Sequence, residues 1–494
     1  MSRWRRHLGI GVPALAAVPA LVFGVSALDA EPVAVVDAET TRPPAELTDA
    51  PLRKAWSYVV GAVFDKVYGT ITGHVRGALH FGTGGWGDIE RAQAGMRRLR
   101  EEHPKLVAHC EQELVVHWVG GWERAEWGGW RRDGYFTTPV AFLCGRESAE
   151  EQLFAEGITV PFRHVVPADA LREEGGRGAG EGGARASSSS SAAAASSASS
   201  ASSASSAAAV ASVPAVRRLR DDVPLCIHLP CNGDKGFAWR EKHFAQHLAR
   251  HEGVGSIIYE APYMGQRRDG RKRVRGAQWD RVSDVVSVGT AGVAEVLALV
   301  LWARGASGVS GVHTAPGTPV CLAGISMGAE VAAGLFDAQR AIRDGGGRAL
   351  DLDLVAVMPV HSGVPVFCHG VMGDVSDWGA LCSEAGLESE AAARQRVEEA
   401  IELTDITKHE YAPAADGLAA RRRAIVIGAV DDGYMPEWSV RATAAHLAKH
   451  HDVKLQWVGG GHCSTVVARK ALVRDSIVDV LKRPARDGCA KPAD

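Results

Sequence analysis

The stretch that decides the fold is VCLAGISMGAEVAAGL, residues 320–335. A short apolar run ends in GISMG, residues 324–328, and a run of small and apolar residues long enough for a helix follows. A serine between a buried strand and a helix matches the G-x-S-x-G pattern of a nucleophile held on a sharp turn. Because glycine supplies 56 of the 494 residues, a chance match is a real alternative, and the surrounding sequence has to decide.

From residue 213 onward, apolar runs of strand length alternate with runs of helix length. The apolar runs are PLCIHL (224–229), SIIYEAP (256–262), PVCLAG (319–324), LVAVMPV (354–360), AIVIGAV (424–430) and VKLQWVG (453–459). Strands that are apolar throughout and alternate with helices indicate a mostly parallel sheet with helices on both faces. With the serine turn at its centre, this pattern predicts an α/β protein with an α/β-hydrolase fold.

Ser326 is the predicted nucleophile of that fold. Gly324 and Gly328 leave room where a Cβ would strike the neighbouring strand or helix. The N-terminus of the following helix favours developing negative charge, and the Met327 N–H can donate to an oxyanion. The alternative is a serine that only caps the helix.

A serine nucleophile needs a base, and the base needs an acid that orients it. In this fold they follow in the order Ser, acid, His, each after a later strand. AIVIGAV leads into Asp431 and Asp432, and VKLQWVG leads through a glycine-rich loop to His462. We therefore predict a triad of Ser326, Asp432 and His462, with Asp431 as the alternative acid. Either aspartate could instead form a turn or cap a helix, and His462 could be a surface histidine.

The oxyanion hole of this fold takes a second N–H from the loop after an earlier strand. PLCIHL runs into PCNGD, residues 230–234, where glycine lets the backbone bend toward a substrate oxygen. The predicted donor is the N–H of Asn232 or of Gly233. The alternative is an ordinary turn, which an Asn-Gly pair would also make.

The N-terminal segment, residues 1–45, is predicted to be a targeting or membrane-anchor segment. Three arginines within the first six residues precede an uncharged run over residues 8–28. A secretory signal, an organelle transit peptide and a membrane anchor all fit this pattern. A second long apolar run, residues 282–302, contains Asp284 and Glu295, which favours a helix packed on the sheet over a membrane span.

The remaining boundaries come from changes in composition. Between residues 187 and 209 the chain contains only Ser and Ala, which cannot bury enough apolar area to offset the entropy of ordering. The predicted regions are an N-terminal helical region (46–134), the first strands of the hydrolase domain (135–171), a disordered low-complexity insert (172–212) and the catalytic domain (213–485), with a lid region at about 361–420.

Charge and cysteine content exclude several partners. The formal net charge is −3, from 55 basic and 58 acidic residues, so no strong field favours nucleic acid. The chain has nine cysteines, an odd number, and no two of them have C-x-x-C spacing. This pattern indicates reduced thiols, and it is not typical of a disulfide framework or a zinc site. We expect neither a metal nor a cofactor, and the oligomeric state stays open.

The chain resembles the α/β-hydrolase domain-containing protein 18 family. The resemblance covers roughly residues 52–485 apart from the insert, and it rests on motifs found in order: GGWGDIERA, RRDGYFTTPV, PLCIHLPCNGDKGFAWR, YEAPYMGQR, CLAGISMGAEVA, HSGVPVFCHGVM, AIVIGAVDDGYMP and QWVGGGH. In the family pattern the acid stands four residues before a proline, which supports Asp432 before Pro436. The resemblance implies a mitochondrial, membrane-associated serine hydrolase that acts on lipid acyl esters, with a phospholipid such as cardiolipin as a candidate substrate.

Two other functions remain open from the sequence. One is a catalytically silent α/β-hydrolase fold used as a binding or scaffold protein, because a fold does not imply an activity. The other is an acyltransferase that uses the same triad with an alcohol acceptor in place of water. The intact Ser326, Asp432 and His462 argue against the silent fold, whereas the acyltransferase would need the same three residues.

Overall fold

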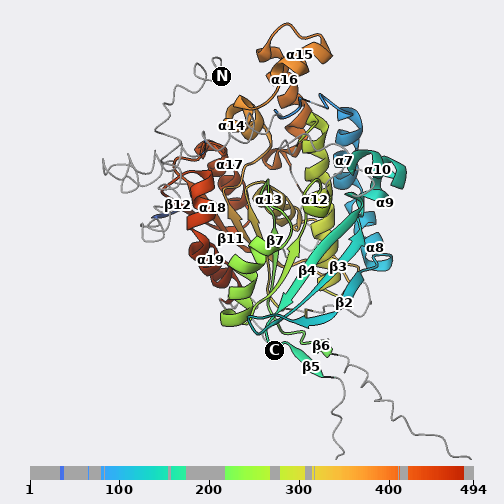
Figure 1. Cartoon of the computed structure of the whole chain (residues 1–494), viewed down its shortest axis with the longest axis vertical. Coiled ribbons are helices and arrows are strands. Elements are labelled where there is room, and N and C mark those ends of the chain that lie inside the picture. The colour runs from blue at the N-terminus through green and yellow to red at the C-terminus, as the bar shows by residue number, and fades with distance from the viewer. Residues whose placement is uncertain are drawn as a thin grey trace, which may run out of the picture.

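The structure is a computed structural model that describes residues 34–37, 65, 79–82, 84–153, 157–173, 217–267, 279–305, 314–315, 317–409, 411 and 421–482. Within these residues, ten strands form one sheet in the order β1-β12-β11-β10-β9-β7-β8-β4-β3-β2. The sheet is parallel from β12 to β8 and antiparallel at both of its ends. Figure 1 shows it as a twisted layer at the centre of the molecule.

The parallel part of the sheet is built from the six apolar runs that were predicted as strands. They are β7 (Leu225–Leu229), β8 (Gly255–Tyr259), β9 (Val320–Ile325), β10 (Leu352–Val357), β11 (Arg423–Ala429) and β12 (Asp452–Val458). Every residue of β7, β8, β9 and β10 is buried. Because successive side chains of a strand point to opposite faces, both faces of the sheet are covered. The predicted mostly parallel sheet with helices on both faces is thereby confirmed.

The covering helices follow the strands in chain order. A helical segment, residues 238–252, follows β7, and the long helix α12 (Val282–Ala303) follows β8. Helix α13 (Met327–Ala338) follows β9, and α17 (Glu437–Ala448) follows β11. Helices α13 and α19 (Lys470–Lys482) both pack on β9 and β10 without pairing with each other, so they lie on opposite faces.

Helix α12 is a core helix, as its charged residues predicted. It is long and apolar enough to cross a membrane, yet nearly all of it is buried against α13 and the N-terminal helices. Glu295 is completely buried and forms two bonds of 2.7 Å with the guanidinium of Arg267. Thr138 Oγ1 donates to the same carboxylate at 2.6 Å, and the Tyr259 hydroxyl also donates to it. Such a fully bonded charge belongs in a protein interior.

The N-terminal helices are α7 (Ile89–Glu101) and α8 (His103–Gln112), and both lie within the predicted helical region 46–134. Helix α7 turns Ala92, Met96 and Leu99 inward and packs along α12. The predicted helical region 46–134 is nevertheless wrong in its last part. Residues 117–124 form β2 and residues 130–137 form β3, which together with β4 (Thr159–Val166) extend the sheet.

The physical reason for this correction is that β2 is an edge strand exposed along most of its length. It carries two adjacent glycines and charged residues, so it lacks the apolar alternation that marks a half-buried strand. The region 135–171, predicted to hold the first strands of the hydrolase domain, also contains helices. Strand β3 ends at Thr137, and Pro139 starts helix α9 (Val140–Cys144), which α10 (Arg146–Leu153) follows.

Two predicted segments fall mostly outside the described residues. Strand β1 (Ala34–Asp37) belongs to the segment 1–45, which was set aside from the fold, and it pairs with β12 at the edge of the sheet. The insert 172–212 begins inside β5 (Leu171–Glu173), which pairs with β6 (Arg217–Leu219). The rest of both segments lies outside the described residues. The β5–β6 pair therefore marks where the chain enters and leaves the insert.

The region between β10 and β11 holds the predicted lid. Its helices are α14 (Val371–Asp374), α15 (Trp378–Ala385) and α16 (Glu390–Ile401), with single helical turns at 365–369, 402–404 and 406–408. These elements lie above the carboxyl ends of the parallel strands (Figure 1). Residues 410 and 412–420 lie outside the described part of the chain.

Candidate active site

Ser326 lies on a strained turn between β9 and α13. Its backbone has φ 57° and ψ −124°, a conformation that non-glycine residues seldom adopt. The backbone packs so closely around this turn that only glycine fits at positions 324 and 328. A Cβ on Gly324 would stand 2.1 Å from the Gly328 oxygen, and a Cβ on Gly328 would stand 2.6 Å from the Pro230 oxygen. The two glycines therefore serve the close packing that was predicted for them.

His462 and Asp432 meet at the carboxyl ends of β12 and β11. His462 Nδ1 lies 2.8 Å from Asp432 Oδ2, and both side chains are almost fully buried. The other carboxylate oxygen accepts the N–H groups of Tyr434 and Met435, each at 2.8 Å. These two bonds fix the carboxylate, which in turn orients the imidazole. The aspartate that contacts His462 is thus Asp432, while the Asp431 N–H donates to the Gly460 oxygen at 3.0 Å.

The electrostatics around His462 favour the protonated ring. Burial acts to lower the pKa of His462, but the carboxylates of Asp432 and Asp65 act in the opposite direction, and the net pKa is raised. An imidazole that accepts a proton readily and is held in one orientation can serve as a general base.

Asp65 is a residue of this site that the sequence analysis missed. Its carboxylate accepts three backbone N–H groups: those of His462 at 2.6 Å, Cys463 at 2.9 Å and Gly433 at 3.1 Å. It thereby joins the loop that carries Asp432 to the start of α18 (His462–Ala468). Burial and the nearby Asp432 raise the pKa of Asp65 despite these bonds.

One sequence signal could have indicated Asp65. It stands in the stretch SYVVGAVFDKVYG, where an acidic residue follows a long apolar run. A charge in such a run needs a partner if the run is buried. Nothing in the local sequence, however, identifies the partner as a loop about four hundred residues further on.

Ser326 and His462 line the same cavity, whose volume is about 310 Å³. The structure describes both residues, and no hydrogen bond joins Ser326 Oγ to the His462 imidazole. Such bonds are often long in unliganded enzymes and shorten when substrate binds. The structure therefore brings the three predicted triad residues to one place, and their catalytic roles stay predictions.

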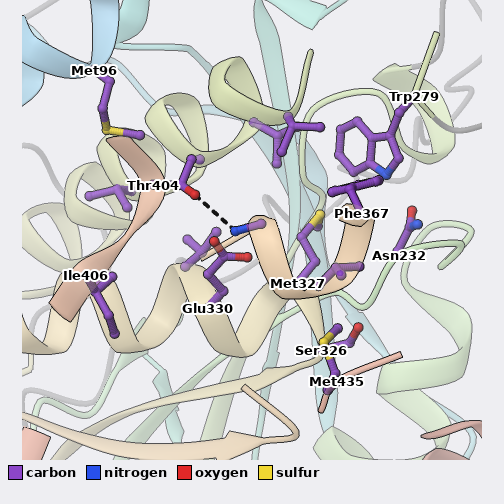
Figure 2. A pocket seen from close by; sticks show the side chains of 18 of the residues that line it. Met96, Asn232, Trp279, Ser326, Met327, Glu330, Phe367, Thr404, Ile406 and Met435 are labelled. Carbon is purple, nitrogen blue, oxygen red and sulfur yellow. Dashed lines mark hydrogen bonds between the residues drawn. The ribbon is translucent and has the colours of Figure 1, made fainter. Parts of the chain in front are cut away.

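The predicted oxyanion-hole residues lie on the rim of the same cavity. Asn232, Gly233 and Met327 all line it, and Figure 2 shows Asn232 and Met327 near Ser326. Residues 231–234 form a turn closed by the Asp234 N–H, which donates to the Cys231 oxygen at 3.2 Å, with Gly233 at φ 90°. The N–H groups at the centre of such a turn remain available to a ligand. The Met327 N–H opens helix α13 and has no acceptor within that helix.

The cavity extends from Ser326 along the whole of α13. Its walls include a stripe of residues on each of two packed helices: Met327, Glu330, Val331, Gly334 and Ala338 on α13, and Val285, Val288, Gly289, Val293 and Leu297 on α12. At about 1.5 Å per residue, the twelve residues of α13 span about 18 Å. The cavity is therefore a long channel between α12 and α13 with mostly aliphatic walls.

The far end of the channel is polar. Arg100, His103, His409 and Tyr411 line it there, close to the C-terminal end of α13. Arg100 bonds to the Leu403 oxygen and to His409 Nε2. Burial lowers the pKa of His409 to about 4, so this ring is neutral near pH 7. These polar groups therefore line the part of the channel that is remote from Ser326.

Within the described part of the chain, no group of three or more His, Cys, Asp or Glu side chains is arranged to hold a metal ion. Two cysteines flank the site: Cys463 lines the cavity beside His462, and Cys231 lies in the loop after β7. Burial raises the pKa of both thiols, which keeps them protonated.

A comparison with models of protein families agrees with this fold. A family model described as alpha/beta hydrolase domain containing 18 matches residues 190–412 and 386–483. No curated protein matches the chain. Solved structures similar to it include acetyl xylan esterase 1 from Thermoanaerobacterium sp. JW/SL YS485 (11% identity, 78% of this chain and 91% of that chain, TM-score 0.40). Another is the acetyl xylan esterase from Paenibacillus sp. R4 (11% identity, 79% and 94%, TM-score 0.42).

The family model extends over more than half of the chain and includes Ser326, Asp432 and His462. The mostly parallel sheet, the serine turn after β9 and the order of the three residues are those of an α/β hydrolase. The chain belongs to the alpha/beta hydrolase domain containing 18 family.

Proposed function

We propose that the protein is a serine hydrolase that cleaves a carboxylic ester through Ser326, His462 and Asp432. One observation carries the proposal: a serine on a strained strand–helix turn shares a cavity with a histidine whose other nitrogen is held by a buried carboxylate. A serine that merely capped α13 would not need this backbone strain, and its hydroxyl caps no helical N–H here.

In the proposed mechanism, His462 Nε2 takes the proton of Ser326 Oγ while Oγ forms a bond to the ester carbonyl carbon. The carbonyl oxygen becomes an oxyanion and accepts the Met327 N–H and an N–H of Asn232 or Gly233. The tetrahedral intermediate then expels the alcohol, which receives the proton from His462. Water, deprotonated by the same histidine, releases the acid and restores Ser326. No step needs a metal or a cofactor.

The shape of the channel supports a lipid acyl ester as the substrate. Aliphatic walls over about 18 Å would bury a long acyl chain, and each buried methylene contributes about 0.8 kcal/mol. A short polar acid would leave most of the channel unfilled. Among lipid esters, a phospholipid such as cardiolipin is the candidate that the family resemblance implies.

We further propose that the protein associates with a mitochondrial membrane through residues 1–45. The Arg-rich start and the uncharged run after it support this. Fusing residues 1–45 to a fluorescent protein tests it directly. Co-localisation with a mitochondrial marker, lost when the three arginines are replaced, would support the proposal, and a secretory distribution would contradict it.

The experiment that tests the activity is labelling of the full chain with a fluorophosphonate probe, followed by mapping of the labelled peptide. We expect labelling at Ser326 that disappears in Ser326→Ala and weakens strongly in His462→Ala. Ser476→Ala, which removes a buried serine on α19, is the matched control and should leave labelling unchanged.

The same experiment separates the competing functions. A folded wild-type protein that takes no probe would contradict the hydrolase and favour a silent scaffold. A labelled protein that consumes long-chain esters is then assayed with an added alcohol. Transfer of the acyl group to that alcohol in preference to water would identify an acyltransferase.

A further inference from the structure

The channel wall carries one acidic side chain close to the nucleophile. Glu330 lies four residues after Ser326 on α13, so the two share a helix face and are separated by about 6 Å along the axis. Glu330 lines the cavity, and its carboxyl group projects from α13 toward the channel in Figure 2. A group bound to Ser326 and extending along α13 would pass this carboxyl first.

Glu330 has no protein partner among the described residues. No hydrogen bond or ion pair reaches its carboxyl; the Thr404 Oγ1 on the opposite wall accepts the Gly363 N–H at 3.0 Å. A carboxyl group without a hydrogen-bond partner in an apolar channel lowers the stability of the folded protein. A half-buried carboxyl that lines a channel without a partner among the described residues needs an explanation, and in a binding channel the natural explanation is a ligand.

The protonation state of Glu330 defines what it can bind. Burial, assisted by the nearby charge of Asp405, raises the pKa of Glu330 to about 8. The group is therefore mostly an uncharged carboxylic acid near pH 7, with one O–H donor and acceptor oxygens. Such a group matches a neutral oxygen function, which can accept its O–H or donate to its carbonyl oxygen. A cation is a poorer match, because its charge would also have to enter the aliphatic channel.

We infer that Glu330 is a specificity-determining residue, which hydrogen-bonds a hydroxyl or keto oxygen carried by the acyl chain a few carbons beyond the ester carbonyl. The inference rests on the proposed function, since it assumes that the acyl chain runs along α13. A plain hydrocarbon chain in the same place would leave the carboxyl desolvated and unpaired. A site built to hydrogen-bond a substrate oxygen discriminates strongly against an analogue that lacks it.

The test compares nitrophenyl esters of equal chain length, with and without a hydroxyl at roughly the third to the sixth carbon. We expect the wild-type protein to prefer the best hydroxylated ester by about tenfold or more in kcat/KM. Glu330→Leu should lose this preference while it still cleaves the plain ester, because no carboxyl is then left unpaired in the channel. Glu330→Gln should keep part of the preference, since the amide still donates and accepts.

A matched control is Val331→Ile, which changes the volume of the next channel residue without changing its polarity. This variant should change kcat/KM for both esters by the same factor. A wild-type protein that takes the fluorophosphonate probe but cleaves both esters equally would overturn the inference and leave the proposed function intact. A preference that persists in Glu330→Leu would also overturn it. A folded wild-type protein that takes no probe and cleaves no ester would overturn both.

Discussion

Two of the buried carboxylates in the described residues, those of Glu295 and Asp432, each bond a basic side chain, and they differ in what surrounds them. Glu295 on α12 has both oxygens bonded to Arg267 and further donors from Thr138 and Tyr259. Asp432 after β11 is bonded just as fully, but its partner His462 lines a cavity. The first set is closed on all sides by protein, whereas the second leaves one nitrogen of the base directed to a ligand space.

Burial of a charged side chain does not by itself reveal its role. What distinguishes the two sets is whether every member is satisfied within the protein. The Glu295 set is satisfied, so its loss should affect the free energy of unfolding. The Asp432 set keeps a basic nitrogen available, so its loss should affect catalysis. Glu330, which lines the channel and has no partner among the residues that the structure describes, extends the contrast to substrate selection.

The largest expected effect is on catalysis. Asp432→Asn should lower kcat by on the order of a thousandfold or more, because the amide favours the wrong tautomer of His462 and no longer stabilises the imidazolium. The thermal unfolding midpoint should change little by comparison. Ester hydrolysis with a long-chain substrate, measured beside calorimetry, checks both. A variant that retained most of its activity would remove Asp432 from the proposed triad.

The opposite result is expected for the core set. Glu295→Leu should lower the free energy of unfolding by about 3–5 kcal/mol, because it leaves the Arg267 guanidinium buried without a counter-charge. The kcat of the folded fraction should stay near that of the wild-type protein. Denaturant unfolding measures the loss, and the double variant with Arg267→Met should recover much of it. No recovery in the double variant would show that packing, and not charge, accounts for the effect.

A smaller effect is expected at Asp65, which connects the two loops of the site. Asp65→Asn should lower kcat by about tenfold, because an amide cannot accept all three N–H groups as a carboxylate does. The acid limb of the pH profile is the fall of kcat/KM as the pH drops through the pKa of His462. Asp65→Asn should also move this limb to lower pH, because Asp65 helps to raise the pKa of His462. A purely structural role would change kcat without moving that limb.

The control for Asp65 is another buried aspartate that bonds a histidine. Asp337 on α13 lies 3.0 Å from His446 Nε2 and does not line the cavity. Asp337→Asn should lower stability and leave the acid limb in place. If both variants moved the limb equally, the contribution of Asp65 would be a general effect of net charge.

The smallest expected effect is a shift in the pH at which the wild-type protein loses activity on the acid side. The neutral form of His462 is the base, so activity should fall as the pH drops through its pKa. Because the folded protein raises this pKa, the midpoint in kcat/KM should lie above the usual value of about 6.5. A pH profile with a substrate that does not itself titrate checks this. A midpoint below the usual value would show that burial outweighs the two carboxylates.

Much of the fold and part of the site could be predicted from the sequence. The six parallel strands are apolar at nearly every position because both faces of the sheet are covered, and this signal is local. The turn at Ser326 is also local, since two glycines and a serine at fixed spacing suffice for it. Asp432 and His462 could be placed because each directly follows such a strand.

Other features could not be predicted, because they depend on contacts between distant segments. The edge strands over residues 117–137 are mostly exposed, so no periodic apolar pattern separates them from a loop or a helix. Asp65 is a single residue whose partners lie near the other end of the chain. Glu330 reads as an ordinary polar residue of a helix until α12 and α13 enclose the channel that it faces.

Patterns among neighbouring residues indicate the order of the parallel strands and the residues available at their carboxyl ends, because strand burial and tight turns constrain adjacent positions. Which carboxylates are enclosed by protein, which face a cavity and how far that cavity extends follow from the packing of the folded chain. Those properties depend on the packing of residues hundreds of positions apart, and local sequence carries no record of such packing.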